Sequence, residues 1–473
     1  MASILDKLLK RKSILVSNPS MFIALYDQAV SASAAREFER ALELYDQAIK
    51  LNPSHAEAYY KRGNILKDLG RLHAAIASYD QAILLTPNYA HAYCNRGVIQ
   101  QSLGLKSEAL SSYNLAIAHD PSDAMAYYNR ALLLQDCSRW DEALQSYDQA
   151  IAADPAFADA QYNRAVALLS GGDFGRGWAS YEWRWKSARR LGLGEVRDFS
   201  QPLWLGEGSV GGKRILLHGE GGLGDTLQFC RYASLLAGRG AIVYLEVPAS
   251  LVNLLANLDG VTQVIAQGDA LPPFDIHCPL LSLPLACKTT FEGVPAAQRY
   301  LYGEEAKVRQ WRLRLKEQKR PWVGLVWSGN PDNTGDLRRS IRLADWVSHL
   351  PSEIQYFRLQ LDVRKDDQAV LDSKSSSIAS LDDNLLDFAN VAALCECMDI
   401  VISVDTSLAH LSAALGRRTW ILLSSSPDWR WLRDREDSPW YPSVKLYRQE
   451  SAGEWREVFE RIAADLRQEF QVS

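Results

Sequence analysis

The apolar residues in the first third of the chain recur with helical spacing, and this pattern itself repeats. Prolines stand every 34 residues, at Pro53, Pro87, Pro121 and Pro155. Tyrosine and alanine columns keep the same interval, at Tyr45, Tyr79, Tyr113, Tyr147 and Tyr181, and at Ala41, Ala75, Ala109 and Ala143. We predict a solenoid of helix pairs, in which alanines allow close helix contact, tyrosines fill grooves and each proline ends a second helix.

The spacing and residue types resemble those of the tetratricopeptide repeat (TPR) over residues 20–185, about four and a half repeats. After Leu169 the fifth repeat loses its register. The stretch that follows contains the glycine pair Gly171-Gly172 and then three tryptophans, Trp178, Trp183 and Trp185. We expect the solenoid to end here and its tryptophans to dock on the next domain, while the array holds a protein or peptide partner.

Beyond Leu193 the pattern changes to short β-rich apolar runs that alternate with helical segments, which is typical of βαβ units and a parallel sheet. The clearest predicted strands are residues 213–218, 241–247, 322–327, 399–404 and 419–423, and residues 225–236 read as a helix. The predicted organisation is an N-terminal helical segment 1–19, the solenoid, a linker 186–212, two Rossmann-like halves 213–318 and 319–448, and a C-terminal helix 449–473.

Ligands of such sheets bind beyond the carboxyl ends of strands, so the loops after His218, Trp327 and Val404 are the candidate sites. The loop after Val404 has hydroxyl groups at the start of a helix, whose free N–H groups suit a diphosphate; the alternative is that Asp405 or Thr406 only caps the helix. The loop after His218 is rich in glycine, which permits close approach to a ligand but also serves ordinary turns. It lacks the lysine and hydroxyl residue of a Walker motif.

Taken together, Gly222-Leu-Gly-Asp225-Thr-Leu-Gln and Val404-Asp-Thr-Ser-Leu-Ala-His410-Leu-Ser-Ala-Ala resemble the two signatures of the heptosyltransferase family of GT-B glycosyltransferases. The resemblance covers residues 213–448, strongly in these two loops and weakly between them. It implies an α/β GT-B fold of two Rossmann-like halves after the all-α TPR superhelix.

The same resemblance implies roles for individual residues. Asp225 would be the general base that deprotonates the acceptor hydroxyl, a step that an alcohol needs at neutral pH. The donor would be held by Gly222, Gly224, Asp405, Thr406, Ser407 and His410. To these donor-binding candidates we add Ser328 and Asn330 of the loop after Trp327. Just past that loop, Arg338, Arg339 and Ser340 are the candidates that meet the charge of the departing diphosphate. The alternatives are a solvated charge run around Arg339 and a core role for His410.

One column of the solenoid contains asparagine, a poor residue for a helix interior, at Asn95, Asn129 and Asn163. A similar column lines the concave face of O-linked N-acetylglucosamine transferases and grips the acceptor backbone, so these three residues are the candidate acceptor site. Contacts between neighbouring repeats are an equally good explanation. The arginine that follows each of them is expected to pack structurally or face solvent.

Composition narrows the function further. The 473-residue chain is 47% hydrophobic and 23% charged, ordinary for a globular protein of two or three domains. Its formal net charge of −5 gives no basic field for nucleic acid. The seven cysteines show neither a disulfide framework nor paired zinc spacing. Because no run resembles a signal peptide or a membrane span, we expect a cytoplasmic protein.

These features predict an inverting, metal-independent glycosyltransferase that moves a sugar from a nucleotide-sugar donor to a protein acceptor held by the TPR array. No cofactor is expected besides the donor, whose nucleotide stays open. The heptosyltransferase-like motifs favour an ADP-linked donor, the repeats favour UDP-N-acetylglucosamine, and flagellin-glycosylating enzymes suggest CMP-linked nonulosonic acids. Two alternatives are a noncatalytic TPR scaffold with a relict GT-B domain and a heptosyltransferase-like enzyme with a saccharide acceptor.

Overall fold

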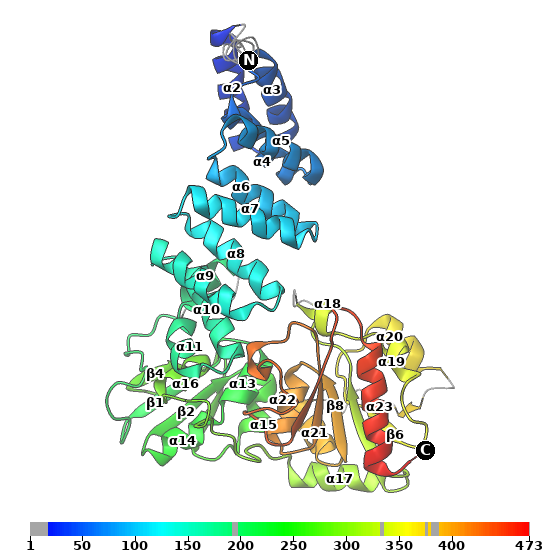
Figure 1. Cartoon of the computed structure of the whole chain (residues 1–473). Helices are drawn as coiled ribbons and strands as arrows, with labels where there is room; N and C mark the ends of the chain where they lie inside the picture. The colour runs from blue at the N-terminus through cyan, green and yellow to red at the C-terminus, as the bar shows by residue number, and fades with distance from the viewer. Residues whose placement is uncertain (1–17, 192–196, 332–334, 374–376, 380–386, 473) are drawn as a thin grey trace. The chain divides into compact units, whose positions relative to one another are not determined.

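The computed structural model describes residues 18–191, 197–331, 335–373, 377–379 and 387–472. Its internal contacts divide the chain into two units, Met1–Ala167 and Leu168–Ser473 (Figure 1). Residues 1–17 of the predicted N-terminal helical segment lie outside the described residues. The two units are taken in turn below.

The first unit is a series of helices that pack in consecutive pairs. Its helices are α2 (Pro19–Ala34), α3 (Phe38–Leu51), α4 (Ala56–Asp68), α5 (Leu72–Leu85), α6 (Ala90–Ser102), α7 (Lys106–His119), α8 (Ala124–Asp136), α9 (Trp140–Ala153) and the first part of α10 (Ala158–Ser170). As predicted, the second helix of each pair ends just before its proline: α3 ends at Leu51, two residues before Pro53.

The repeating columns form the core of this unit. The side chains of Tyr79 and Ala75 are fully buried, like their counterparts in the other repeats. A Cβ atom on Gly63 would lie 2.6 Å from the Tyr79 ring, so the ring packs on bare backbone. The arginine column is structural, as expected: Arg62 donates to Asp46 Oδ1 and Ser78 Oγ, both at 2.6 Å, and thereby ties α4 to α3 and α5.

The second unit begins within α10 and continues through α11 (Phe174–Tyr181) and α12 (Arg184–Leu191). Trp178 Nε1 donates to Thr289 O at 3.0 Å, and its ring lies edge-on to Trp429 with centroids 5.3 Å apart. Trp178 thus packs inside the second unit, and the docking of the solenoid through these tryptophans stays a prediction. The contacts of Trp183 and Trp185 are with Lys186, Glu182 and Arg184 of the same stretch.

Two parallel sheets form the rest of the unit, and both have the Rossmann-like order in which the first strand is central. The first sheet runs β3-β2-β1-β4, from β1 (Arg214–His218), β2 (Ile242–Val247), β3 (Val261–Ala266) and β4 (Ile276–Pro279). The second runs β10-β9-β8-β5-β6-β7, from β5 (Trp322–Val326), β6 (Gln355–Arg358), β7 (Ile378–Ala379), β8 (Ile400–Val404), β9 (Thr419–Leu423) and β10 (Val444–Arg448).

Helices connect and cover these strands (Figure 1). In the first half they are α13 (Leu223–Phe229), α14 (Tyr232–Gly238), α15 (Val252–Leu255) and α16 (Leu283–Ala286). In the second they are α17 (Glu305–Leu315), α18 (Asp336–Arg339), α19 (Leu343–Val347), α20 (Lys365–Leu371), α21 (Phe388–Cys395), α22 (Ser407–Ala414) and α23 (Arg456–Phe470). Buried residues of α23, among them Phe459 and Ile462, complete the core of the second sheet.

The predicted continuous helix 225–236 is wrong, because the chain breaks between α13 and α14. Arg231 at the break is buried, and its Nε donates to Gln228 O at 2.7 Å, one of the carbonyls at the end of α13. Its Nη1 donates to Trp440 O at 2.6 Å. A buried guanidinium that needs several acceptors thus ends the helix early.

The chain is therefore an all-helical TPR array followed by an α/β region with two parallel sheets, as the sequence predicts, and this region is consistent with a GT-B-like domain. Across the part of the chain that the structure describes, every helix is too short or too polar to cross a membrane.

Candidate functional site

The predicted site loops lie at the topological switch points of the two sheets. In the first sheet β1 lies between β2 and β4, and in the second β5 lies between β6 and β8. The loops that leave β1, β5 and β8 at their carboxyl ends are the three singled out from the sequence. The two switch points face each other, because α13 of the first half packs against α22 of the second.

Asp225 lies in the first turn of α13, where its carboxylate caps the helix. Its Oδ2 accepts a hydrogen bond from Gly222 N at 2.8 Å. A Cβ atom on Gly221 would lie 2.2 Å from the same oxygen, so glycine is needed there for the carboxylate to turn back. The side chain is 26% exposed and thus reaches solvent.

Arg430 brings the second half of the unit to Asp225. It lies in the 3-10 helix η5 (Trp429–Trp431), which follows β9, and its Nη2 donates to Asp225 Oδ1 at 2.5 Å. Its Nη1 and backbone N both donate to Asp428 Oδ1, at 2.8 and 3.0 Å. Burial acts to lower the pKa of Arg430, but the Asp428 and Asp225 carboxylates raise it well above its ordinary value.

Gly224 allows the two halves to approach closely at the same point. A Cβ atom there would lie 2.9 Å from the ring of His410 in α22. His410 is buried, shares a hydrogen bond of 2.9 Å between its Nδ1 and Tyr441 Oη, and stacks on Trp431. Burial, together with nearby arginines, lowers its pKa well below the ordinary value. These are the contacts of a neutral core histidine, and a donor-binding role for it stays a prediction.

The start of α22 holds the predicted donor residues Thr406 and Ser407, which are half-buried. Thr406 occupies the N-cap position, but among the described residues no side chain caps this helix. Thr406 Oγ1 instead lies 3.3 Å from Ser403 Oγ. The capping alternative for this loop is therefore not what the structure shows, and N–H groups at the start of α22, beginning with Ser407, are left to meet an anion.

Asp405 precedes this N-terminus and carries an unusual carboxyl group. Burial, and then the nearby Asp428 carboxylate, raise the pKa of Asp405 to about 6, although Arg339 and Arg430 oppose the shift. Arg339 Nη1 donates to Asp405 O at 2.8 Å, which joins the loop after β5 to the loop after β8.

The remaining predicted donor residues lie in the loop after β5. The side-chain amide of Gln360 binds both backbone groups of Ser328. Gln360 Oε1 accepts from Ser328 N at 3.1 Å, and Gln360 Nε2 donates to Ser328 O at 3.0 Å. Ser340 Oγ accepts from Gly329 N at 3.0 Å. The Ser328 hydroxyl is buried and has no hydrogen-bond partner in the described part of the chain. Asn330 is exposed on the same loop.

The structure therefore links Asp225 of the first half to Asp405 and Arg339 of the second, with Arg430 between them. Sequence reasoning did not assign a site role to Arg430. The Asp225–Arg430 pair joins residues 205 positions apart. Sequence reasoning also missed Arg184, which lies beside the loop after β1. Arg184 donates to Glu220 Oε1 at 2.8 Å and to Ser282 Oγ at 2.7 Å.

The asparagine column lies in the other unit and contacts the preceding repeat. Asn95 Nδ2 donates to Asn64 Oδ1 at 2.9 Å and Asn163 Nδ2 donates to Tyr128 Oη at 2.8 Å. Asn129 Nδ2 lies 3.6 Å from Cys94 Sγ, which is a weak acceptor. The structure thus supports contacts between repeats, and acceptor binding stays a prediction.

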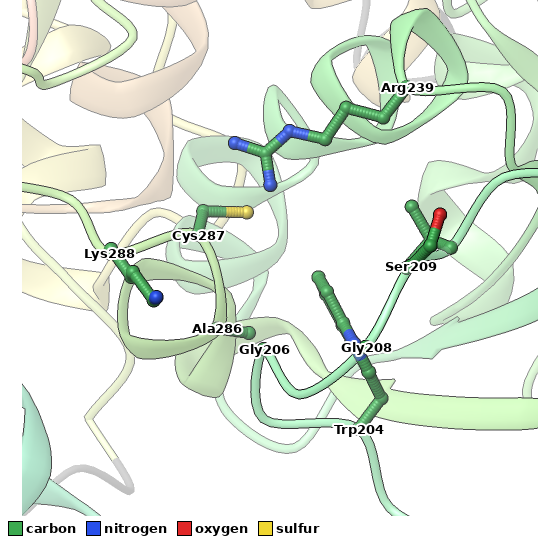
Figure 2. A pocket seen from close by; sticks show the side chains of 9 residues that line it. Trp204, Gly206, Gly208, Ser209, Arg239, Ala286, Cys287 and Lys288 are labelled. Carbon is green, nitrogen blue, oxygen red and sulfur yellow. The ribbon is translucent and has the colours of Figure 1, made fainter.

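A cavity of about 390 Å³ lies elsewhere in the α/β unit, and no predicted site residue lines it. Figure 2 shows Trp204, Arg239 and Cys287 around it. Burial raises the pKa of the Cys287 thiol to about 11, so this sulfur is not a nucleophile near neutral pH.

Comparisons with known families agree with the two units. Tetratricopeptide-repeat models match residues 37–70, 63–104 and 133–172, and further ones match 90–123 and 112–145. A model described as glycosyltransferase family 9 (heptosyltransferase) matches residues 384–454, the stretch that contains Asp405, His410 and Arg430. The protein thus combines TPR repeats with a domain of the glycosyltransferase family 9 type.

Among individual proteins, the chain is similar to Protein FlbA of Caulobacter vibrioides, with 28% identity over 337 residues, 63% of this chain and 53% of FlbA. The chain thus spans about half the length of this curated relative. Two similar solved structures are YrrB, titled a TPR protein with an unusual peptide-binding site (24% identity, 39% of this chain and 90% of that one, TM-score 0.29), and MamA of Desulfovibrio magneticus RS-1 (18%, 36% and 95%, TM-score 0.32).

Proposed function

We propose that this protein is an inverting, metal-independent glycosyltransferase that moves a sugar from a nucleotide-sugar donor to a protein acceptor bound by its TPR array. The observation that carries the proposal is the meeting of the two switch points, where α13, which bears Asp225, packs against α22 and Arg430 of the second half donates to Asp225. The family 9 match over that second loop supports the reaction class, and the repeats support a protein or peptide acceptor.

In the proposed reaction the acceptor hydroxyl attacks the anomeric carbon from the face opposite the leaving group. A C–O bond to the acceptor forms while the C–O bond to the donor's phosphate breaks, and Asp225 takes the hydroxyl proton. The departing phosphate carries the electron pair away. The N–H groups of α22 and the guanidinium of Arg339 stabilise its negative charge, the task that a divalent cation performs in metal-dependent enzymes.

A ligand panel tests this proposal and identifies the donor. The full chain is heated with UDP, ADP, GDP or CMP in buffer containing EDTA. A ligand at 100 times its Kd stabilises the folded state by about 2.7 kcal/mol, which gives a clear rise in Tm. We expect one nucleotide to raise the Tm of the α/β unit, and the matching sugar nucleotide is then used for transfer assays. If none of them raises the Tm, the scaffold alternative replaces the enzyme.

The choice of acceptor substrate distinguishes the proposed enzyme from the alternative that acts on a saccharide. With the donor fixed, protein acceptors and a lipid-linked saccharide are offered in parallel, and we expect transfer to protein. If only the saccharide is glycosylated, and substitutions on the TPR array leave turnover unchanged, the enzyme acts as an ordinary heptosyltransferase-like transferase.

A further inference from the structure

The carboxylate proposed as the base has both oxygens in use. Asp225 Oδ2 accepts from Gly222 N and Oδ1 accepts from Arg430 Nη2. The first bond holds the carboxylate in place at the start of α13. The bond from Arg430 occupies a lone pair of Oδ1 on the side of the second half, where the donor loops lie. Asp225 is therefore already paired with Arg430 before an acceptor hydroxyl arrives.

Arg430 is held in a way that leaves this second bond exchangeable. Its side chain is only 8% exposed, and Asp428 accepts from both its backbone N and its Nη1. Its guanidinium carbon lies 4.4 Å from the centroid of the Trp429 ring. These contacts fix the backbone of Arg430 and the Nη1 side of its guanidinium. Within the described residues its buried Nε has no hydrogen-bond partner, so the arginine has donor capacity to spare.

The charges around Arg430 indicate what would take up that capacity. Three carboxylates, Asp225, Asp405 and Asp428, share this part of the site with two guanidinium groups, Arg339 and Arg430. A donor diphosphate would add negative charge beside the start of α22. Arginine binds phosphate oxygens with two parallel hydrogen bonds, which makes a diphosphate a strong competitor for a guanidinium that is paired with a carboxylate.

We propose that Arg430 is exchanged between Asp225 and the donor: without donor it pairs with Asp225, and with donor bound it pairs with the diphosphate and leaves Asp225 Oδ1 free to accept the acceptor's proton. This inference rests on the proposed function and names the diphosphate-binding residue of that site. Asp428 keeps the guanidinium anchored in both states. The exchange makes the base available only when there is a donor to attack.

The test is a double-substitution cycle read out by nucleotide affinity. The Kd of the nucleoside diphosphate that binds in the panel above (UDP, ADP or GDP) is measured by calorimetry for the full chain, Asp225→Asn, Arg430→Gln and the double variant. Hydrogen bonds to charged groups contribute about 1.5 to 3 kcal/mol, so Arg430→Gln should weaken binding about 10- to 100-fold. Asp225→Asn removes the competitor and should tighten binding, by about 10-fold. In the Arg430→Gln background, Asp225→Asn should change nothing.

Two outcomes would overturn the exchange. If Asp225→Asn leaves the affinity unchanged or weakens it, the ion pair is only a structural link. If it tightens binding equally with and without Arg430, simple charge repulsion explains the effect. Arg430→Lys keeps the charge without the fork and should bind nucleotide with intermediate affinity, which covers the case that Arg430→Gln does not fold. Arg435→Gln, which removes an exposed ion pair with Asp437 in the same segment, is the matched control and should bind like the wild type.

The proposed function and the exchange fail in different ways. If neither UDP nor ADP, nor GDP or CMP in the panel above, binds the wild type, both are wrong. If the wild type binds CMP alone, only the exchange is wrong, because that donor has no diphosphate. The same holds if the wild type binds a nucleoside diphosphate and transfers sugar but the cycle shows no tightening in Asp225→Asn.

Discussion

The helical unit and the α/β unit use charged side chains in opposite ways. In the helical unit, polar contacts recur at fixed distances along the chain: Arg62 to Asp46 and Arg96 to Asp80 each span 16 residues. In the α/β unit they join remote segments, as when Arg430 meets Asp225 across 205 residues and Arg339 meets Asp405 across 66. Contacts of the first kind build a scaffold, and contacts of the second kind assemble a site.

This difference has consequences for mutation. A repeat contacts only its neighbours, so a lost ion pair there is local and its effect adds to others. In the α/β unit, one buried arginine serves several acceptors at once, so its loss should be large and coupled. Four substitutions test this comparison, from the largest expected effect to the smallest.

Asp225→Asn should have the largest effect, a fall in kcat of about 100- to 10,000-fold, the usual contribution of a general base. The amide keeps the size of the side chain but cannot accept the proton. Sugar transfer is measured at saturating donor. Asp275→Asn is the control: this carboxylate pairs with Arg214 at the start of β1 and should transfer sugar at the wild-type rate. Wild-type turnover in Asp225→Asn would remove Asp225 from the base role.

Arg184→Ala should cost about 3 to 5 kcal/mol of stability, because it leaves the carboxylate of Glu220, whose side chain is 9% exposed, without its charged partner. Arg96→Ala, in the helical unit, should cost at most about 1 kcal/mol, since its pair with Asp80 is half exposed. Tryptophan fluorescence follows the unfolding of the α/β unit and so measures Arg184→Ala, because Trp140 is the only tryptophan among residues 1–167. Circular dichroism follows the unfolding of the helical unit and so measures Arg96→Ala. Equal losses would contradict the contrast between the units.

Asp405→Asn should stabilise the α/β unit above pH 6, by about 1 kcal/mol after allowing for partial exposure. Folding raises the pKa of this carboxyl group from 3.8 to about 6, so its stabilising contribution is complete below pH 3.8 and is lost as the pH rises through 6. Denaturation midpoints at pH 4 and pH 7.5 measure the change. Asp275→Asn should behave oppositely, because Arg214 lowers the pKa of Asp275 to about 2. A pH-independent effect of Asp405→Asn would contradict the assignment.

The contrast also explains what the sequence could predict. The 34-residue period revealed the helices, the tyrosine core and the structural arginines, because each contact lies within one or two repeats. Strand patterns likewise located the loops after β1, β5 and β8. The break at Arg231 and the Asp225–Arg430 pair stayed hidden, because each depends on which remote acceptor a buried guanidinium meets. Spacing along one sequence carries no signal for that choice.

Asn129→Ala should have the smallest effect on stability and decides whether the helical unit is more than a scaffold. In the described part of the chain its amide nitrogen donates to a sulfur atom, a weak acceptor, so we expect a loss of at most about 0.5 kcal/mol. Asn163→Ala is the matched control, because that amide donates a good hydrogen bond to Tyr128 and should cost about 1 kcal/mol. If the column grips the acceptor, both variants raise the acceptor KM. If KM rises only with lost stability, in Asn163→Ala alone, the asparagines hold the repeats together and the acceptor binds elsewhere.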